Sequence, residues 1–517
     1  MTARPIRLLS GFFTVGVWTM ASRILGFVRD ILIAAFLGAG PVAEAFFVAF
    51  RLPNMFRRFF AEGAFNMAFV PLFAKKLEGD GEAAARSFAV QAMSGLTAVL
   101  IVFTVIAQIV MPWMIFALAS GYDGERFDLA VAFARIVFPY ILFISLAALV
   151  SGILNSFGRF AAAAAAPVLL NVILVVAMSA GWALGWNIGY VLAWASCLAG
   201  AAQLALVWVA ARRLGMGVLP GRPRWTPEMR RLVSLGVPAA LAGGVVQINL
   251  LVGTQVASYF DGAVAWLWMA DRVYQLPLGV VGIAIGVVLL PELARRLRAD
   301  DLPGTRDSMN RAAEFTLALT VPATVGLIAI PILITAVLFE RGAFTPEDTR
   351  ATAHAIMIYA LGLPAFVLQK VAQPAYFARE DTRTPLRYAL WSMVINLVVA
   401  VGLAPVIGYL AAALGATLAG WVNLALLVRG LTRLDPELVA DNRLLRRLPR
   451  LVVAAVVMGL VAFGLAEMAE IYVPNLRAAS LGAIMAVAIA MYFGTAAVLG
   501  GVAPREILAI VRRRKKE

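Results

Sequence analysis

Between residues 22 and 76 the sequence combines membrane-compatible hydrophobicity with many charged side chains. Those charged residues, up to the final pair of lysines, are Arg23, Arg29, Asp30, Glu44, Arg51, Arg57, Arg58 and Glu62. An ionisable group at the centre of a membrane helix costs about 2.5–3.5 kcal/mol, so five arginines facing lipid would cost on the order of 12–18 kcal/mol. That sum exceeds the net stability of a typical fold. We therefore expect the arginines to face a wet interior or to reach an interface, and a cationic interior indicates an anionic passenger.

The chemistry of this segment points to phosphate. The planar guanidinium group of arginine matches phosphate oxygens in pairs, and three arginines could hold a diphosphate. Nearby charged groups would act as counter-ions or gates while the site is empty. The candidates for that role are Asp30, Glu44, Arg58, Glu62 and Asp271. An alternative stays open for Arg57 and especially Arg58, whose side chains could extend to the cytoplasmic interface.

The composition excludes most other classes of protein. The chain has 517 residues, of which 62% are hydrophobic and 14% charged, with a mean hydropathy of +0.88. These values indicate a polytopic helical membrane protein, and the short alternating segments of an outer-membrane barrel are absent. A single cysteine, Cys197, excludes an internal disulfide, and a single histidine, His354, excludes a histidine-based metal cluster or Ser-His pair. We expect no enzyme activity, no metal, no cofactor and no cleavable signal.

Hydrophobic runs predict fourteen membrane spans that position these residues. The expected spans cover residues 8–37, 41–73, 88–112, 130–153, 161–181, 188–211, 232–260, 263–291, 312–338, 352–376, 386–404, 408–428, 450–467 and 478–501. The first two are longer than a bilayer requires, so bends are expected. Candidate bend points are Gly26, Gly38, Pro53 and Gly63. We expect hydrogen bonds between helices from the side chains of Asn171, Asn249, Asn396 and Asn423.

The distribution of positive charge supports this count. With the N-terminus inside, 32 of the 44 lysines and arginines fall in the predicted cytoplasmic segments. The positive-inside rule then favours an even number of spans with both ends cytoplasmic. The net charge of +15 is therefore mainly a signal of membrane orientation, and it does not indicate nucleic-acid binding.

The chain also repeats itself at an offset of 220 residues. Residues 45–52 align with residues 265–272, and residues 70–77 align with residues 290–297. We interpret the repeat as two parallel six-helix lobes around a central site, a common transporter architecture. The expected parts are an N-lobe at 1–215, a C-lobe at 225–435, two added helices at 445–505 that could form a lipid-tail groove or merely pack, and a basic cytoplasmic tail at 506–517.

Several motifs resemble those of a known family. They are SRILGFVRD, AEAFFVAFRLPNMFRRFFAEGAFNMAFVP, MADRVYQLPLGVVGIAIGVVLLP, FERGAFT and QPAYFAREDTRTP. Together they resemble the MurJ (MviN) lipid II flippases of the multidrug/oligosaccharidyl-lipid/polysaccharide exporter superfamily, over nearly the whole chain. The family's essential arginines match Arg23, Arg29, Arg57 and Arg272. Its acidic residue before AFFVAF, usually Asp, matches Glu44, whereas an acid often found after the ADR motif is Gln275 here.

The resemblance implies fourteen helices, two lobes and a central cationic cavity. It also implies alternating access that carries undecaprenyl-diphosphate-linked disaccharide-pentapeptide (lipid II) from the inner to the outer leaflet of the bacterial inner membrane. We expect lipid II and membrane lipids as partners, and no nucleic acid. The alternatives are an exporter of another polyprenyl-linked saccharide, or a membrane glycosyltransferase that uses the same lipid. The latter would need an outer-loop carboxylate with a basic partner, and the sequence groups none with Asp123, Glu125 or Asp128.

Overall fold

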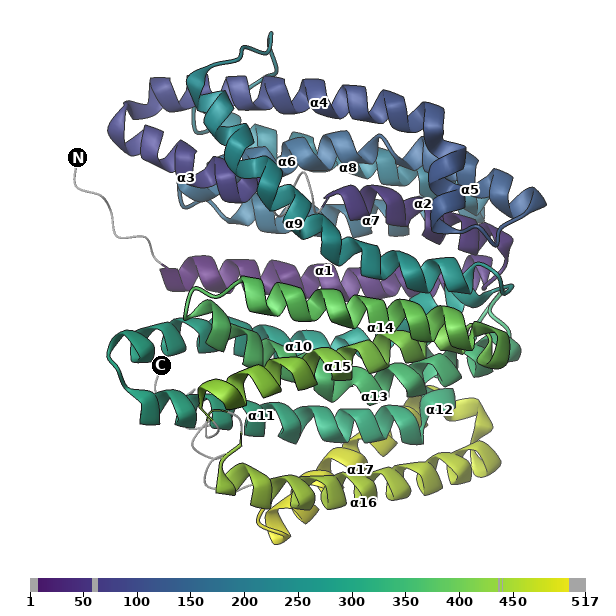
Figure 1. Ribbon diagram of the computed structural model, residues 1–517. Helices are drawn as coiled ribbons and strands as arrows, with labels where there is room; N and C mark the ends of the chain where they lie inside the picture. Colours follow the sequence, from purple (N-terminus) through teal and green to yellow (C-terminus); the bar gives the residue numbers. More distant parts are fainter. Residues whose placement is uncertain (1–7, 58–63, 436–437, 439, 502–517) are drawn as a thin grey trace. The chain divides into compact units, whose positions relative to one another are not determined.

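The computed structural model describes residues 8–57, 64–435, 438 and 440–501. Within these ranges the regular structure is helical, and Figure 1 labels the helices α1 to α17. The predicted all-helical class is confirmed. By contacts between residues the chain divides into two compact units, one formed by residues 1–265 with 342–344 and the other by residues 266–341 with 345–517.

The first unit contains nine complete helices and the first turn of a tenth. The nine are α1 (Leu8–Leu37), α2 (Pro41–Arg57), α3 (Ala64–Gly79), α4 (Gly81–Leu118), α5 (Gly124–Val137), α6 (Tyr140–Ser156), α7 (Ala161–Ala183), α8 (Ile188–Arg212) and α9 (Pro227–Ala257). Helix α10 (Ala263–Arg298) begins in this unit and continues in the other. Within unit 1, α7 packs against α1 and α8, and α2 packs against α5.

The second unit holds the remaining helices. They are α11 (Leu302–Ala329), α12 (Pro331–Phe339), α13 (Pro346–Phe377), α14 (Arg383–Ile407), α15 (Leu410–Leu434), α16 (Asn442–Tyr472), the short η3 (Pro474–Leu476) and α17 (Arg477–Val498). Helix α13 packs against α11 and α15, and α16 packs against α11 and α17. The observed boundary at Ala265 leaves α9 with unit 1, whereas the repeat placed it in the C-lobe. The division into two six-helix lobes stays a prediction.

Two of the expected spans are each divided into two helices. The span expected at 130–153 contains α5 and α6, and that at 312–338 contains α11 and α12. Proline explains both breaks, because Pro139 precedes α6 and Pro331 opens α12, and proline has no backbone N–H to continue the preceding helix. In the span expected at 41–73, residues 58–63 between α2 and α3 lie outside the described residues.

The candidate bend points lie at different places relative to the helix ends, and the bends themselves stay a prediction. Helix α1 continues through Gly26 and ends directly before Gly38, which has a φ of +62°. Helix α2 continues through Pro53, so that residue does not divide the span. Gly63 lies outside the described residues. Left-handed backbone is readily adopted only by glycine, which explains why α1 ends where it does.

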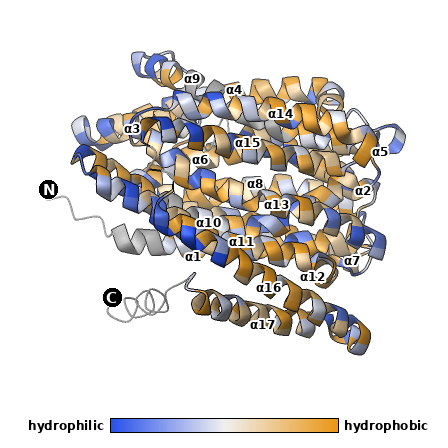
Figure 2. Cartoon of the chain, turned by 60° about the horizontal axis from the view of Figure 1, so that its bottom comes forward, coloured by the Kyte–Doolittle hydropathy of each residue, from blue (hydrophilic) through white to orange (hydrophobic). Residues whose placement is uncertain are grey.

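Ten helical segments within the described ranges are long and apolar enough to cross a membrane. The expected spans at 8–37, 41–73, 232–260 and 263–291 are not among the ten, and the second of these includes residues 58–63, which lie outside the described residues. The count of fourteen therefore stays a prediction. Large apolar side chains are exposed along these helices, for example Ile109 and Trp113 on α4 and Val406 on α14. Figure 2, which colours each residue by hydropathy, shows hydrophobic residues along much of α14 and α16.

Candidate substrate-binding site

Arg29 lies inside unit 1 and has a carboxylate partner. Its side chain on α1 is 8% exposed, and its Nε and Nη2 atoms donate to Asp30 Oδ1 at 3.0 and 2.8 Å. Its Nη1 donates to Asn171 Oδ1 on α7 at 3.1 Å, and its Cζ lies 5.9 Å from the centre of the Phe50 ring. A buried guanidinium is tolerated only when it is paired and hydrogen-bonded, and these contacts meet that requirement.

Asn171 holds α7 against α1 at the same place. Its Nδ2 donates to the carbonyl oxygen of Ser22 at 3.0 Å and to that of Pro167 at 3.2 Å. A Cβ atom at Gly26 would lie 3.5 Å from this Nδ2, in ordinary contact. The space at Gly26 would therefore also accept a Cβ atom beside the amide. Asn423 has a similar role in unit 2, where its Nδ2 donates to Gln369 Oε1 at 2.9 Å.

The other predicted residues of this segment have different environments. Arg23 is exposed on α1, six residues before the buried Arg29, so the two arginines occupy different faces of one unbroken helix. Arg57 is the last residue of α2 and is half-buried. Arg58 and Glu62 lie outside the described residues, as does the side chain of Asn249.

Glu44 belongs to a second polar cluster in unit 1, and its bonding partners differ from those of Arg29. Its carboxylate is fully buried. Its Oε1 accepts from the backbone N–H of Val264 at 3.1 Å, and its Oε2 lies 3.4 Å from Arg126 Nη1. The same Arg126 atom lies 2.6 Å from Asp261 Oδ1. Nothing in the spacing of the sequence groups Arg126 with Glu44, because 82 residues separate them.

One expectation about the outer loop was wrong. The sequence groups no basic partner with Asp123, yet Arg126 Nη2 lies 3.6 Å from Asp123 Oδ1, one helical turn away. Arg126 also faces the ring of Tyr122, with its Cζ 5.1 Å from the ring centre. Arg126 therefore pairs with the carboxylates of Glu44, Asp123 and Asp261. These ion pairs explain the cluster as a structural feature, without a catalytic role.

In unit 2 the ADR motif lies on α10. The guanidinium of Arg272 lies over the ring of Trp268, with its Cζ 4.8 Å from the centre, in a cation–π contact. Asp271 accepts a hydrogen bond from Gln275 Nε2, one turn farther along the helix. An acid at residue 275 would place two like charges four residues apart, which destabilises a helix. Glutamine converts this repulsion into a hydrogen bond.

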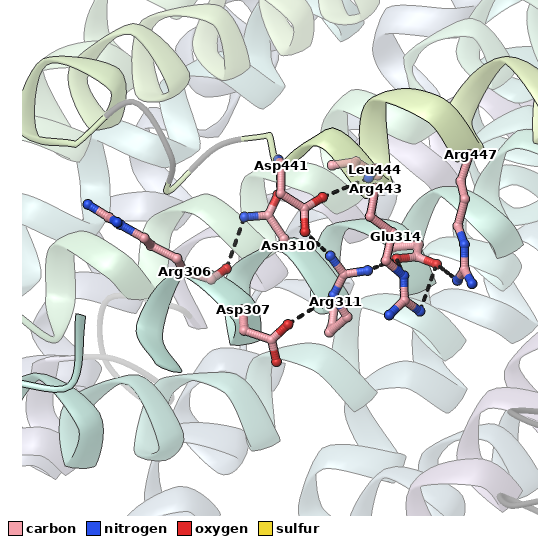
Figure 3. Close-up of polar contacts among 9 residues, drawn as sticks. All are labelled: Arg306, Asp307, Asn310, Arg311, Glu314, Asp441, Arg443, Leu444 and Arg447. Atoms are coloured by element: carbon pink, nitrogen blue, oxygen red, sulfur yellow. Dashed lines mark hydrogen bonds and ion pairs between the residues drawn. The ribbon is translucent and has the colours of Figure 1, made fainter. Parts of the chain in front are cut away.

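A third charged cluster joins α11 to α16 in unit 2, and the sequence did not single it out (Figure 3). Glu314 is 8% exposed. It forms ion pairs with Arg311, Arg443 and Arg447, and Arg311 also pairs with Asp441. Asp441 caps α16 by accepting from the N–H of Leu444 at 2.7 Å.

The structure thus brings Arg29 together with Asp30, joins Glu44 to Arg126, and joins Asp271 to Gln275. Arg272 belongs to the other unit. In the part of the chain that the structure describes, no group of three or more His, Cys, Asp or Glu side chains is arranged to hold a metal ion. Within unit 1, α1 and α2 carry guanidinium groups, one of them buried, and such groups are chemically suited to binding an anion.

Comparison with known proteins gives a consistent result. The family model described as "Lipid II flippase MurJ" matches residues 33–481. A "Probable lipid II flippase MurJ" of Rhizobium meliloti (strain 1021) is 46% identical over 98% of this chain and 96% of its own length. A "Lipid II flippase MurJ" of Burkholderia cenocepacia (strain J2315) is 35% identical over 83% of this chain and 84% of its own length.

Solved structures share the fold. The structure described as "Lipid II flippase MurJ, inward closed conformation" has a TM-score of 0.78 at 22% identity, covering 96% of this chain and 99% of that one. An inward-facing multidrug resistance transporter of the MATE family, within the MOP superfamily, has a TM-score of 0.64 at 13% identity and covers 82% of this chain and 98% of its own. At these identities the likeness concerns the fold alone.

Proposed function

The chain belongs to the lipid II flippase MurJ family, and from that premise we propose that it translocates lipid II across the bacterial cytoplasmic membrane by alternating access. The observation that carries the proposal is the family relationship along most of the chain. Proteins of this family are transporters, and the proposal assigns no catalytic step to this one. Lipid II combines a headgroup too polar to cross hydrocarbon with a polyprenyl tail that stays in it, so a flippase must shield only the headgroup.

The proposed binding residues are Arg23, Arg29, Arg57 and Arg272. Three arginines on α1 and α2 would hold the diphosphate, and Arg272 on α10 would join from the other unit. The pairing of Arg29 with Asp30 supports this role, because it neutralises the buried guanidinium while no cargo is bound. A diphosphate would then compete with Asp30 for the same donors. Glu44, Arg58, Glu62 and Asp271 stay candidates for gates or counter-ions.

The proposed orientation places both termini in the cytoplasm, as the asymmetry of lysine and arginine predicts. The polyprenyl tail would lie along α16 and α17. The support for this groove is the exposure of large apolar side chains on both helices, including Leu460, Phe463, Met485 and Ile489. Photo-crosslinking from a tail-labelled lipid should label these two helices, and labelling confined to α1 and α2 would contradict the groove.

The test of function is reconstitution. Purified protein in vesicles with a fluorescent lipid II should transfer the labelled headgroup between leaflets, and protein with Ala at both Arg23 and Arg57 should not. Transfer no faster than in protein-free vesicles would overturn the proposal. Equal transfer of a polyprenyl-diphosphate saccharide that lacks the pentapeptide would indicate a broader cargo, and conversion of the lipid to a new product would indicate a transferase.

A further inference from the structure

A basic connector joins α8 to α9 within unit 1, and the proposed binding site gives it no role. We define it as residues 212–231, and it includes six arginines, all with exposed side chains: Arg212, Arg213, Arg222, Arg224, Arg230 and Arg231. Its single acid, Glu228, is already paired with Lys76 on α3 at 2.8 Å. The connector therefore presents an excess of positive charge to its surroundings.

The first part of the connector is anchored on the end of α8. Trp208 Nε1 donates to the carbonyl oxygen of Val218 at 2.9 Å. The guanidinium of Arg212 lies over the same indole, with its Cζ 5.5 Å from the ring centre. Met216 and Val218 are buried. These contacts fold the chain that follows α8 back onto that helix.

The middle of the connector is anchored on α4 through its own backbone. The N–H of Gly221 donates to Ser94 Oγ at 2.8 Å, and the N–H of Arg224 donates to Gln91 Oε1 at 3.1 Å. Because the backbone makes these bonds, the side chains of Arg222 and Arg224 are left exposed. The positive-inside rule explains why arginines occur in such a segment but requires no fixed structure, whereas this connector displays them in one.

Large apolar side chains accompany the arginines. Trp225 is 68% exposed and Leu219 is 64% exposed. On α9, exposed apolar side chains resume at Val233 and Leu235, soon after Arg231. Tryptophan is enriched where a membrane meets water, because its ring is apolar and its N–H is polar. The combination of exposed arginine and tryptophan is therefore typical of a surface at the edge of a membrane.

Helix α4 indicates how deep this surface lies. Its exposed large apolar side chains run from Val99 to Phe116, a rise of about 26 Å that approaches the thickness of the hydrocarbon core. Ser94 lies about 7.5 Å before Val99 along the helix, and Gln91 lies about 12 Å before it. The polar headgroup layer occupies about 5–8 Å on each side of the core. The part of the connector that is bonded to Ser94 therefore lies at the depth of the headgroups.

We propose that the basic connector binds the headgroups of anionic phospholipids in the cytoplasmic leaflet, with its arginines on the phosphates and Trp225 among the headgroups. The inference rests on the orientation given with the proposed function, which places the connector on the cytoplasmic side. Guanidinium groups match phosphate oxygens in pairs, and each basic residue near an anionic surface is worth about a fivefold gain in affinity. An acidic protein would match the charge, but it would not explain exposed Trp225 and Leu219 at headgroup depth.

A fluorophore at the connector tests the proposal directly. The environment-sensitive dye NBD would be attached to Trp225→Cys, in a Cys197→Ser background, with the protein in lipid nanodiscs. Its emission should shift to the blue as phosphatidylglycerol replaces phosphatidylcholine, and spin labels on the lipid headgroups should quench it. The control position is Ala83→Cys, an exposed site on α4 about 16 Å farther from the hydrocarbon than Ser94. A dye there should stay in water in every nanodisc.

A pair of double variants separates binding from net charge. Arg222→Gln with Arg224→Gln removes two side chains that do not hold the connector in place, and it should weaken the response to phosphatidylglycerol about 25-fold. The matched control is Lys75→Gln with Arg159→Gln, which removes two exposed positive charges from other segments of unit 1 that are predicted to be cytoplasmic. The control should respond as the natural connector does. Four arginines remain in the connector of the first variant, so its membrane orientation should be unchanged.

The outcomes that would overturn the proposal are distinct. Equal responses of the two double variants would show that no charge in the connector is special. An equal blue shift in pure phosphatidylcholine, or a shift that high salt does not weaken, would indicate apolar insertion alone, because salt screens attraction between charges. A dye that stayed in water in every nanodisc would leave the surface to a soluble acidic partner. Nanodiscs present the same lipid on both faces and contain no cargo, so the result is independent of whether lipid II is the substrate.

Discussion

Arg29 and Asp30, neighbours on α1, form a buried ion pair with 2.8 Å between Nη2 and Oδ1. Removing one member of such a pair leaves an uncompensated buried charge, at a cost of about 3–5 kcal/mol. Arg29→Ala should therefore lower both flipping and the abundance of folded protein. The double variant Arg29→Gln with Asp30→Asn should restore abundance but not flipping. Immunoblots of membranes beside a survival assay separate the two effects, and restored growth in the double variant would remove Arg29 from the binding site.

Arg23 provides the complementary test, because its side chain is exposed and its loss should not disturb folding. Arg23→Ala should abolish flipping at normal abundance, whereas Arg23→Lys should retain part of it, since lysine keeps the charge but lacks the paired donors. We expect the lysine variants at two or more of the positions Arg23, Arg29, Arg57 and Arg272 to flip lipid more slowly than the natural chain. Lysine or glutamine at Arg51 is the control that should grow normally. Normal growth with Ala at both Arg29 and Arg57 would end the cationic-site proposal.

The Glu314 cluster predicts how α16 is attached. Glu314→Gln would leave Arg311, Arg443 and Arg447 without a shared carboxylate, so we expect the free energy of unfolding to fall by about 2–4 kcal/mol. The control is Glu340→Gln, which removes the 2.7 Å pair with the half-exposed Arg477 and should cost less than about 1 kcal/mol. Thermal unfolding in detergent compares the two variants. Equal losses would show that burial of Glu314 is energetically unimportant.

The predicted membrane orientation is tested by labelling single cysteines in whole cells. Cysteines at Asp123, Ile407 and Tyr472 should react with an impermeant reagent, and those at Asp80 and Leu302 should react only after permeabilisation. The reason is the excess of lysine and arginine in the segments predicted to be cytoplasmic. If cysteines at Asp80 and Asp123 reacted from the same side of the membrane, the count of fourteen spans would be contradicted.

The pair between Lys76 on α3 and Glu228 on α9 predicts a dependence on pH. Their 2.8 Å contact is the main cause that lowers the pKa of Glu228 to about 2. Because the folded pKa lies below the unfolded one, the stabilisation is complete above about pH 4.5 and is lost as pH falls toward 2. The pair is partly exposed, so the melting temperature of Glu228→Gln should fall below that of the natural chain by only about 1 °C at pH 6. That difference should shrink progressively between pH 4.5 and 3, and a difference that grew on acidification would refute the assignment.

The sequence by itself determined the class of protein and the family. Hydrophobic runs and basic loops show the class because a bilayer admits so few structures, and motifs such as SRILGFVRD carry the family resemblance because they are long and specific. The choice of Arg23, Arg29, Arg57 and Arg272 also came from these motifs. Local breaks were partly predictable, since Gly38 ends α1 as a glycine with positive φ should. Pro53, by contrast, stays inside α2, which continues to Arg57.

Only the tertiary structure decided which charged side chains form ion pairs with one another. Arg126 reaches Glu44 across 82 residues and Arg447 reaches Glu314 across 133, and no periodicity records partners on separate helices. Burial of Arg29 near an exposed Arg23 likewise follows from the packing of α7 on α1, where Arg29 donates to Asn171. The contact of FERGAFT with α1 was invisible for the same reason. A Cβ at Gly342 would lie 2.2 Å from the carbonyl oxygen of Ala35, and this approach exists only when residues distant in sequence are folded together.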